Sequence, residues 1–227
     1  MYDKKYIGES HRRRLLVFSS FGLQRFVPII VILILVPLFL SINWLKALAH
    51  INDPSQKFEA FRVTYELLVL IFFPFFSCWW SILSLSEYVE ADGRELFATL
   101  PKSHHRRDAF YFFLLSLALI AIVVIAANLL VGGLWISGLR LLLVCVFFFG
   151  LTFLSLLLFR SPAITILLLL MLTMLSFTVG TQMLTQSFPF YVTAETPLEL
   201  IALVPYTPYL FVGIAFITAT YFVKNKT

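Results

Sequence analysis

Charged residues are scarce in this sequence of 227 residues. They make up 13% of the chain, against about 25% in an ordinary soluble domain, while 60% of the residues are hydrophobic and the mean hydropathy is +0.94. A water-soluble fold of this length has too little interior to bury so much apolar surface. The composition therefore excludes a soluble globular protein and predicts a membrane protein.

Residues that carry chemistry are also few. The two cysteines, Cys78 and Cys145, fall inside apolar stretches and lack the spacing of a disulfide framework or a metal site. No Gly-x-x-x-x-Gly-Lys-Ser/Thr stretch occurs, so the chain has no P-loop for nucleotide phosphates. No charge lies near the middle of an apolar stretch, where proton relays and ion-coupled carriers place one. We therefore expect no enzyme activity, and neither a metal nor a cofactor bound by this chain.

Apolar stretches of sufficient length to cross a bilayer occur six times. A helix needs roughly 20 apolar residues to cross the hydrocarbon core, and it satisfies its own backbone hydrogen bonds there. Gly132, Gly133 and Gly138, with Trp135 among them, predict a short interfacial turn between the third and fourth stretches. We expect an all-α, polytopic membrane protein, a single domain over residues 1–227, with spans near 26–46, 65–86, 109–131, 140–159, 163–184 and 205–223.

Lys and Arg indicate the orientation, because these residues remain on the cytoplasmic side. With the N-terminus inside, thirteen of the 17 lie on the cytoplasmic side. The other four are Lys46, Lys57, Arg62 and Arg140. This asymmetry predicts a multi-pass protein of the cell membrane with both termini cytoplasmic, and membrane lipid rather than nucleic acid explains the net charge of +5. Three charges at span ends, Glu66, Arg140 and Arg160, are expected to snorkel to the interface.

The N-terminal residues 9–25 predict an amphipathic elbow helix on the cytoplasmic surface. On a helical wheel one broad side is apolar and the opposite side is polar. Arg12 and Phe21 interrupt this pattern. The apolar side comprises Leu15, Leu16, Phe18, Leu23 and Phe26, and the polar side Arg13, Ser20 and Gln24.

The longest cytoplasmic loop, residues 87–108, predicts a helix of about two turns from Gly93 to Leu100. Asp92 and Glu95 resemble a capping box at its start, and Pro101 ends it. The bulky side chains of Leu96, Phe97 and Leu100 fall on one side. Two interpretations follow: a plug for a groove on a partner protein, or a solvated hairpin whose apolar side rests on the membrane or on the protein itself.

The same loop resembles that of permease subunits of ABC type-2 exporters. In that family an acidic residue and a glycine precede a short apolar helix, which closes at a proline before basic residues and a new span. The residues in matching places here are Glu90, Gly93, Glu95, Leu96, Leu100, Pro101 and Arg106, whereas Arg94 replaces the usual Thr and Lys102 follows the proline. The resemblance implies a coupling helix seated in a separate ATPase subunit. Its residues would be Glu90, Asp92, Gly93, Arg94, Glu95, Leu96, Phe97, Leu100, Pro101 and Arg106.

The resemblance further implies the function and the assembly. The chain would be a permease that exports an amphipathic or hydrophobic substrate, such as a peptide, a drug or a lipid-like molecule. It would form a dimer with itself or a related chain, and ATP and Mg would bind to the ABC ATPase partner subunit. The second and fifth spans of the two protomers would face each other and line the route, which assigns Trp79, Trp80, Thr173 and Ser176 to it.

The outer segment 185–208 is too apolar for a free loop, and four prolines exclude a regular span. We expect a re-entrant segment before the sixth span, which by the same resemblance would cap the exit of the route. The alternative is an aromatic belt that anchors the sixth span.

Three other interpretations of the whole chain agree with its length and composition. A membrane subunit of a haem-exporter-like assembly would have the same length and span count, and copurified haem would indicate it. A lipid-acting membrane enzyme would turn over lipid as the isolated chain. An immunity or assembly factor would function without any ATPase.

His104 and His105 are adjacent, so their side chains point in different directions, and no third ligand for a metal lies nearby. We therefore expect both histidines to lie at the level of the lipid headgroups, beside Arg106 and Arg107.

Overall fold

The computed structural model describes residues 14, 15, 17–51, 53–89, 104–183, 203 and 206–223. Every regular element within these ranges is a helix, which confirms the predicted all-α class. The elements are η1 (Gly22–Phe26), α2 (Val27–Ile30), η2 (Val31–Leu35), α3 (Val36–His50), α4 (Pro54–Val89), α6 (His104–Val131), α7 (Trp135–Phe159), α8 (Pro162–Met183) and α9 (Thr207–Val223).

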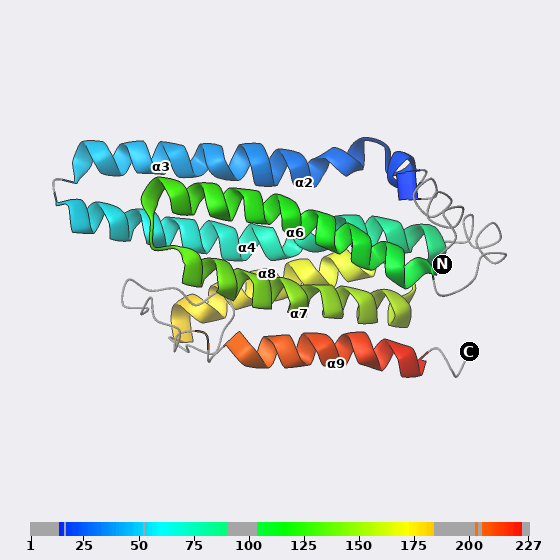
Figure 1. Ribbon diagram of the computed structural model, residues 1–227. Helices are drawn as coiled ribbons and strands as arrows, with labels where there is room; N and C mark the ends of the chain where they lie inside the picture. The colour runs from blue at the N-terminus through cyan, green and yellow to red at the C-terminus, as the bar shows by residue number, and fades with distance from the viewer. Residues whose placement is uncertain are drawn as a thin grey trace, which may run out of the picture.

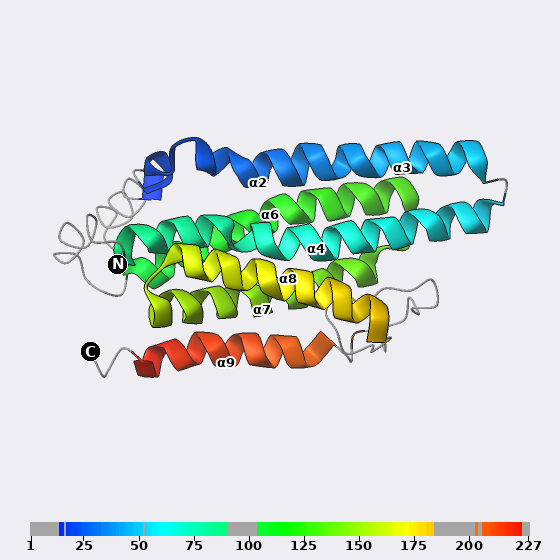
Figure 2. The ribbon, with the colours of Figure 1, turned by 180° about the vertical axis from the view of Figure 1, so that it is seen from behind.

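The long helices lie side by side and alternate in direction (Figures 1 and 2). At one extremity of the bundle lie the last residues of α3 and α6. The first residues of α4, α7 and α9 lie at the same extremity. At the other extremity α4 ends and α6 begins, beside the α7–α8 connection and the last turn of α9. We name these extremities the His50 end and the Val89 end, after the last residues of α3 and α4.

Three helical stretches of the described chain are long and apolar enough to cross a membrane: Gly22–Lys46, Arg106–Leu130 and Trp135–Phe159. Shorter apolar stretches overlap the other three predicted spans, at Phe72–Ser86, Pro162–Met174 and Thr207–Thr220. Length and composition thus identify a membrane-embedded helical protein.

Helix α4 begins eleven residues before the predicted second span, at Pro54 rather than near 65. The Asp53 carboxylate caps it by accepting hydrogen bonds from the hydroxyl and the backbone N–H of Ser55, at 2.8 and 3.0 Å. These bonds lower the pKa of Asp53 below its usual value. The helix continues for 36 residues to Val89, about 54 Å at 1.5 Å per residue, whereas the hydrocarbon core is about 30 Å thick. α4 therefore joins the two ends of the bundle.

Helices α7 and α9 approach each other through two glycines. A Cβ on Gly150 would overlap the carbonyl oxygen of Gly213, and a Cβ on Gly213 would lie 2.8 Å from the Cα of Phe147. Backbone atoms cannot move aside as the end of a side chain can, so any larger residue would push the helices apart. Small residues allow the close backbone contact on which helix packing in membranes depends.

The turn between α6 and α7 is where the glycines predicted it, at residues 132–134. Gly132 and Gly133 have φ angles of +78° and +70°, a region that glycine adopts without strain. The side chain of Asn128 accepts a hydrogen bond from the N–H of Leu134 at 2.9 Å and closes the turn. Gly138 does not belong to the turn, contrary to the prediction. It lies inside α7, where a Cβ would meet Cγ1 of Val124 at 2.8 Å.

Candidate functional site

The predicted coupling helix falls outside the described residues, and so do nine of its ten assigned residues: Glu90, Asp92, Gly93, Arg94, Glu95, Leu96, Phe97, Leu100 and Pro101. The described residues on either side are placed. α4 ends at Val89 and α6 begins at His104, and both lie at the Val89 end (Figure 1). Arg106, the tenth assigned residue, donates from Nη2 to the carbonyl oxygen of Thr220 on α9 at 2.9 Å. The structure thus ties the residues that follow the loop to the last helix.

The first turns of α6 are fixed to two other elements. The hydroxyl of Ser81 on α4 donates to the carbonyl oxygen of Ala109 at 2.9 Å. Nε of Arg14 lies 3.0 Å from Oδ1 of Asp108, whose side chain is fully buried. The Arg14 guanidinium also lies over the ring of Tyr111, 4.4 Å from its centroid. Removing one partner of a buried charge pair typically lowers the stability of a protein by about 3–5 kcal/mol. Asp108 and Arg14 therefore hold the N-terminal segment, by which we mean the described residues 14, 15 and 17–26, against α6.

An aromatic cluster joins the N-terminal segment to α4 and α6 at the same end. Val17, Phe21, Trp80 and Phe112 are all buried and pack together with Phe18. The helical wheel placed Phe21 outside the apolar pattern, yet Phe21 is only 6% exposed. The predicted apolar side is divided instead: part of it packs on the bundle, whereas Leu15 and Leu23 are 55% and 85% exposed. The wheel failed because it assumed one apolar surface, the membrane, whereas this segment also contacts its own protein.

Trp79 and Trp80, two residues assigned to the substrate route, both contact this segment. The indole N–H of Trp80 donates to the carbonyl oxygen of Arg25 at 2.9 Å, and that of Trp79 to the carbonyl oxygen of Gln24 at 3.1 Å. Trp80 is 2% exposed. Both indole N–H groups therefore connect α4 to η1. This contact is compatible with a second role for the rest of each ring, such as lining a route.

The other two residues assigned to the route lie on α8. Thr173 is buried, and its hydroxyl donates to the carbonyl oxygen of Leu169 one turn earlier at 2.8 Å. Ser176 lies on the same helix, but its side chain is outside the described part of the structure. Helix α8 packs against α4 and α7. The structure thus places the four predicted residues on two neighbouring helices, and their role as a route stays a prediction.

A group of interacting charged side chains, which the sequence analysis did not predict, lies between α4 and α7 towards the His50 end. Glu66 and Arg62 of α4 and Arg140 of α7 are 0%, 1% and 0% exposed. The Glu66 carboxylate accepts a hydrogen bond from the Ser137 hydroxyl. It lies 3.5 Å from Nη1 of Arg140 and 3.6 Å from Nη1 of Arg62. Arg62 also donates two hydrogen bonds to the Glu59 carboxylate, at 2.7 and 2.9 Å. We call these five residues the buried ionic cluster.

The buried ionic cluster corrects the expectation that Glu66 and Arg140 snorkel to the interface. Both side chains turn inward because each meets an opposite charge, and a paired charge need not reach the headgroups. The guanidinium of Arg140 also lies 5.5 Å from the ring centroid of Tyr206. The spacing of Arg62 and Glu66, four residues apart on one helix, was a signal for the pair within α4. No such signal existed for Arg140, which is 74 residues from Glu66.

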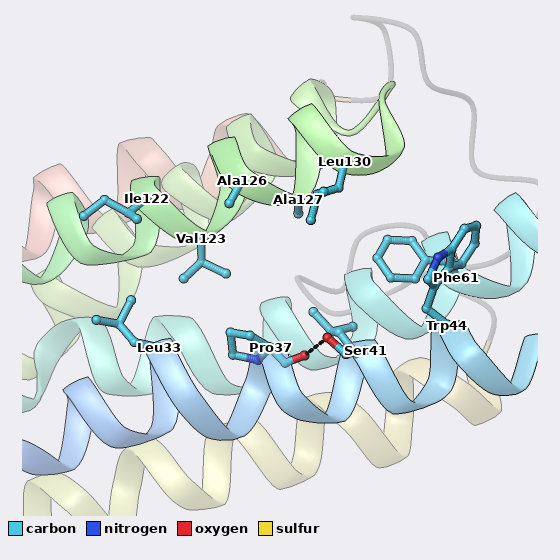
Figure 3. A pocket seen from close by; sticks show the side chains of 11 residues that line it. Leu33, Pro37, Ser41, Trp44, Phe61, Ile122, Val123, Ala126, Ala127 and Leu130 are labelled. Atoms are coloured by element: carbon cyan, nitrogen blue, oxygen red, sulfur yellow. Dashed lines mark hydrogen bonds between the residues drawn. The ribbon is translucent and has the colours of Figure 1, made fainter.

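An apolar groove lies between α3 and α6 (Figure 3). Its volume is about 420 Å³, and its walls include Leu33, Trp44, Phe61 and Ile122. The hydroxyl of Ser41 in its wall donates to the carbonyl oxygen of Pro37 at 2.8 Å. Side chains of this kind suit a hydrocarbon chain and exclude a free ion.

No family model, no curated protein and no solved structure matches the chain.

Proposed function

We propose that the chain is the membrane-spanning permease subunit of an ATP-driven ABC exporter of type 2. One observation carries the proposal: the segment predicted to be the coupling helix joins two helices whose adjoining residues are fixed to the bundle. Ser81 holds α4 to α6, and Asp108 holds α6 to the N-terminal segment. A displacement of residues 90–103 would therefore move α4, α6 and the elbow together.

The alternating helices support six spans with the Val89 end in the cytoplasm. Arg14, Arg25, Arg106, Arg107 and Arg160 lie at this end. At the other end Arg62 and Arg140 belong to the buried ionic cluster, so of the four cations expected there only Lys46 and Lys57 lie outside the cluster. The larger number of cations at the Val89 end supports a cytoplasmic orientation for that end, and both chain ends would then lie in the cytoplasm.

Helix α4 would transmit the motion. It runs from the proposed coupling segment to the buried ionic cluster, where it is paired with α7. Closure of two ATPase subunits would shift the equilibrium between inward-open and outward-open states, provided that they contact the coupling segment differently in each. ATP and Mg would bind to those subunits. The substrate would be amphipathic or hydrophobic, which agrees with the apolar walls of the groove and with the indoles of Trp79 and Trp80 on α4.

Replacing Leu96 and Phe97 by glutamate tests the proposal. We expect the variant to insert into the membrane but to lose its ATPase during copurification in mild detergent, because charged groups would be buried in the partner's groove. Ala98→Glu is the matched control, since helical periodicity places it on the opposite side of the expected helix. An ATPase that remains bound to the Leu96→Glu, Phe97→Glu variant, or transport by the purified chain alone, would contradict the assignment.

A further inference from the structure

A second groove, at the Val89 end, differs from the apolar groove because two guanidinium groups line it. It lies between α6, α7 and α9 and is lined by Arg106, Arg107, Phe110, Phe149, Phe153 and Ile217. Its volume is about 220 Å³, below the roughly 300–1,000 Å³ of a pocket that encloses a whole small molecule. The groove therefore suits one part of a larger molecule whose remainder lies in the bilayer.

The residues that line this groove lie at successive distances from the Val89 end of the bundle. Arg106 and Arg107 belong to the first turn of α6, and Phe110 lies one turn further into the helix. On α7, Phe153 is closer to the Val89 end and Phe149 lies one turn deeper. The ring of Phe149 stacks on Phe113, with a centroid distance of 4.2 Å. Cations thus lie at the level of the helix end, and a wall of aromatic rings continues below them.

The two arginines differ in their contacts. Arg106 is fixed by its bond to the carbonyl oxygen of Thr220, so its charge is held in position. Arg107 is exposed, and no hydrogen bond or ion pair joins it to another residue in the described ranges. Arg107 differs in this respect from Arg14, which lines a neighbouring groove and is paired with Asp108. Among the residues that the structure describes, none therefore competes with an anion for the charge of Arg107.

We propose that this groove binds an anionic phospholipid of the cytoplasmic leaflet. Its phosphate lies against Arg106 and Arg107, and the upper part of one acyl chain lies along Phe110, Phe149 and Phe153. Basic pockets between transmembrane helices on the cytoplasmic side attract anionic headgroups, and a guanidinium donates to phosphate in a forked geometry. The bound lipid joins α6 to α7 and α9 directly after the proposed coupling segment.

Lipid binding by the purified full-length chain tests this proposal. Phosphatidylglycerol and phosphatidylcholine with identical acyl chains are compared by native mass spectrometry in detergent. We expect phosphatidylglycerol to bind more tightly, and Arg107→Gln to weaken it about fivefold, the effect of one cation near a charged membrane surface. Arg160→Gln, which removes an exposed cation at the same end but outside the groove, leaves the preference unchanged. Phe110→Ala weakens both lipids equally, because the ring contacts the acyl chain.

Three outcomes would overturn the proposal: equal binding of the two lipids, an unchanged preference in Arg107→Gln, or displacement of phosphatidylglycerol by inorganic phosphate alone. The proposal depends on the cytoplasmic orientation of the Val89 end but not on an ATPase partner. A chain that binds phosphatidylglycerol as expected but copurifies with no ATPase would contradict only the permease assignment.

Discussion

Removing the Glu66 carboxylate should destabilise the protein more than any single change at an exposed charge. In Glu66→Leu the guanidinium of Arg140 stays buried but loses a carboxylate 3.5 Å away. Two unit charges at this distance interact by about 4–5 kcal/mol at an effective dielectric constant of about 20. Buried pairs broken by removing one partner typically lose about 3–5 kcal/mol. For a chain of this size the loss corresponds to a decrease in Tm of about 6–20 °C.

Thermal unfolding of the purified protein in detergent, followed by tryptophan fluorescence, measures this decrease. Glu59→Gln is the matched control because Glu59 belongs to the same cluster but its side chain is 42% exposed. Water screens the Glu59 carboxylate, the amide oxygen of the variant can still accept a hydrogen bond from Arg62, and Arg62 keeps its contact with Glu66, so the control should show a smaller decrease in Tm than Glu66→Leu.

A double variant, Glu66→Leu with Arg140→Leu, removes both charges of this ion pair and separates the pair from the change in packing. If the pair accounts for the loss, the double variant should unfold at a higher temperature than Glu66→Leu alone, because the buried Arg140 cation is removed together with its partner and Arg62 keeps its hydrogen bonds to Glu59. A Glu66→Leu variant as stable as Glu59→Gln, or a double variant with strictly additive losses, would refute the reasoning.

Three further predictions use the same measurement. Gly213→Leu should separate α9 from α7 and lower stability by about 1–3 kcal/mol, whereas Ala215→Leu, on an exposed position of the same helix, should have little effect. Trp80→Phe removes the N–H that bonds to η1 and should cost about 1–3 kcal/mol, in contrast to Trp135→Phe at a 59% exposed position. The pKa of Asp53 is lowered in the folded state, so its cap stabilises α4 above the unfolded pKa of about 4 and is lost as the pH falls through the folded value. The Tm difference between wild type and Asp53→Ala should therefore shrink from pH 6 to pH 3, and should not shrink if the cap is absent.

Hydropathy and helical periodicity determined the class of this protein. Whether a segment enters lipid depends on the length and apolarity of that segment, which are local properties, so the helices fall close to the predicted spans. The turn at Gly132 and Gly133 was predictable for the same reason, because a positive φ angle is a property of single residues. Asp53 also acts locally, as the cap of α4, although hydropathy placed the start of that span further along.

The contacts between helices were decided only by the tertiary structure. Glu66 meets Arg140 because α4 and α7 pack in one particular register and rotation, and hydropathy does not report either. Gly150 is a small apolar residue in the sequence, but the backbone of α9 against it makes its size essential. Phe21 appeared to be an error in an amphipathic pattern until a second apolar surface, formed by Trp80 and Phe112, accounted for it. A sequence records which side chains avoid water, but which of them meet depends on helices that are distant along the chain.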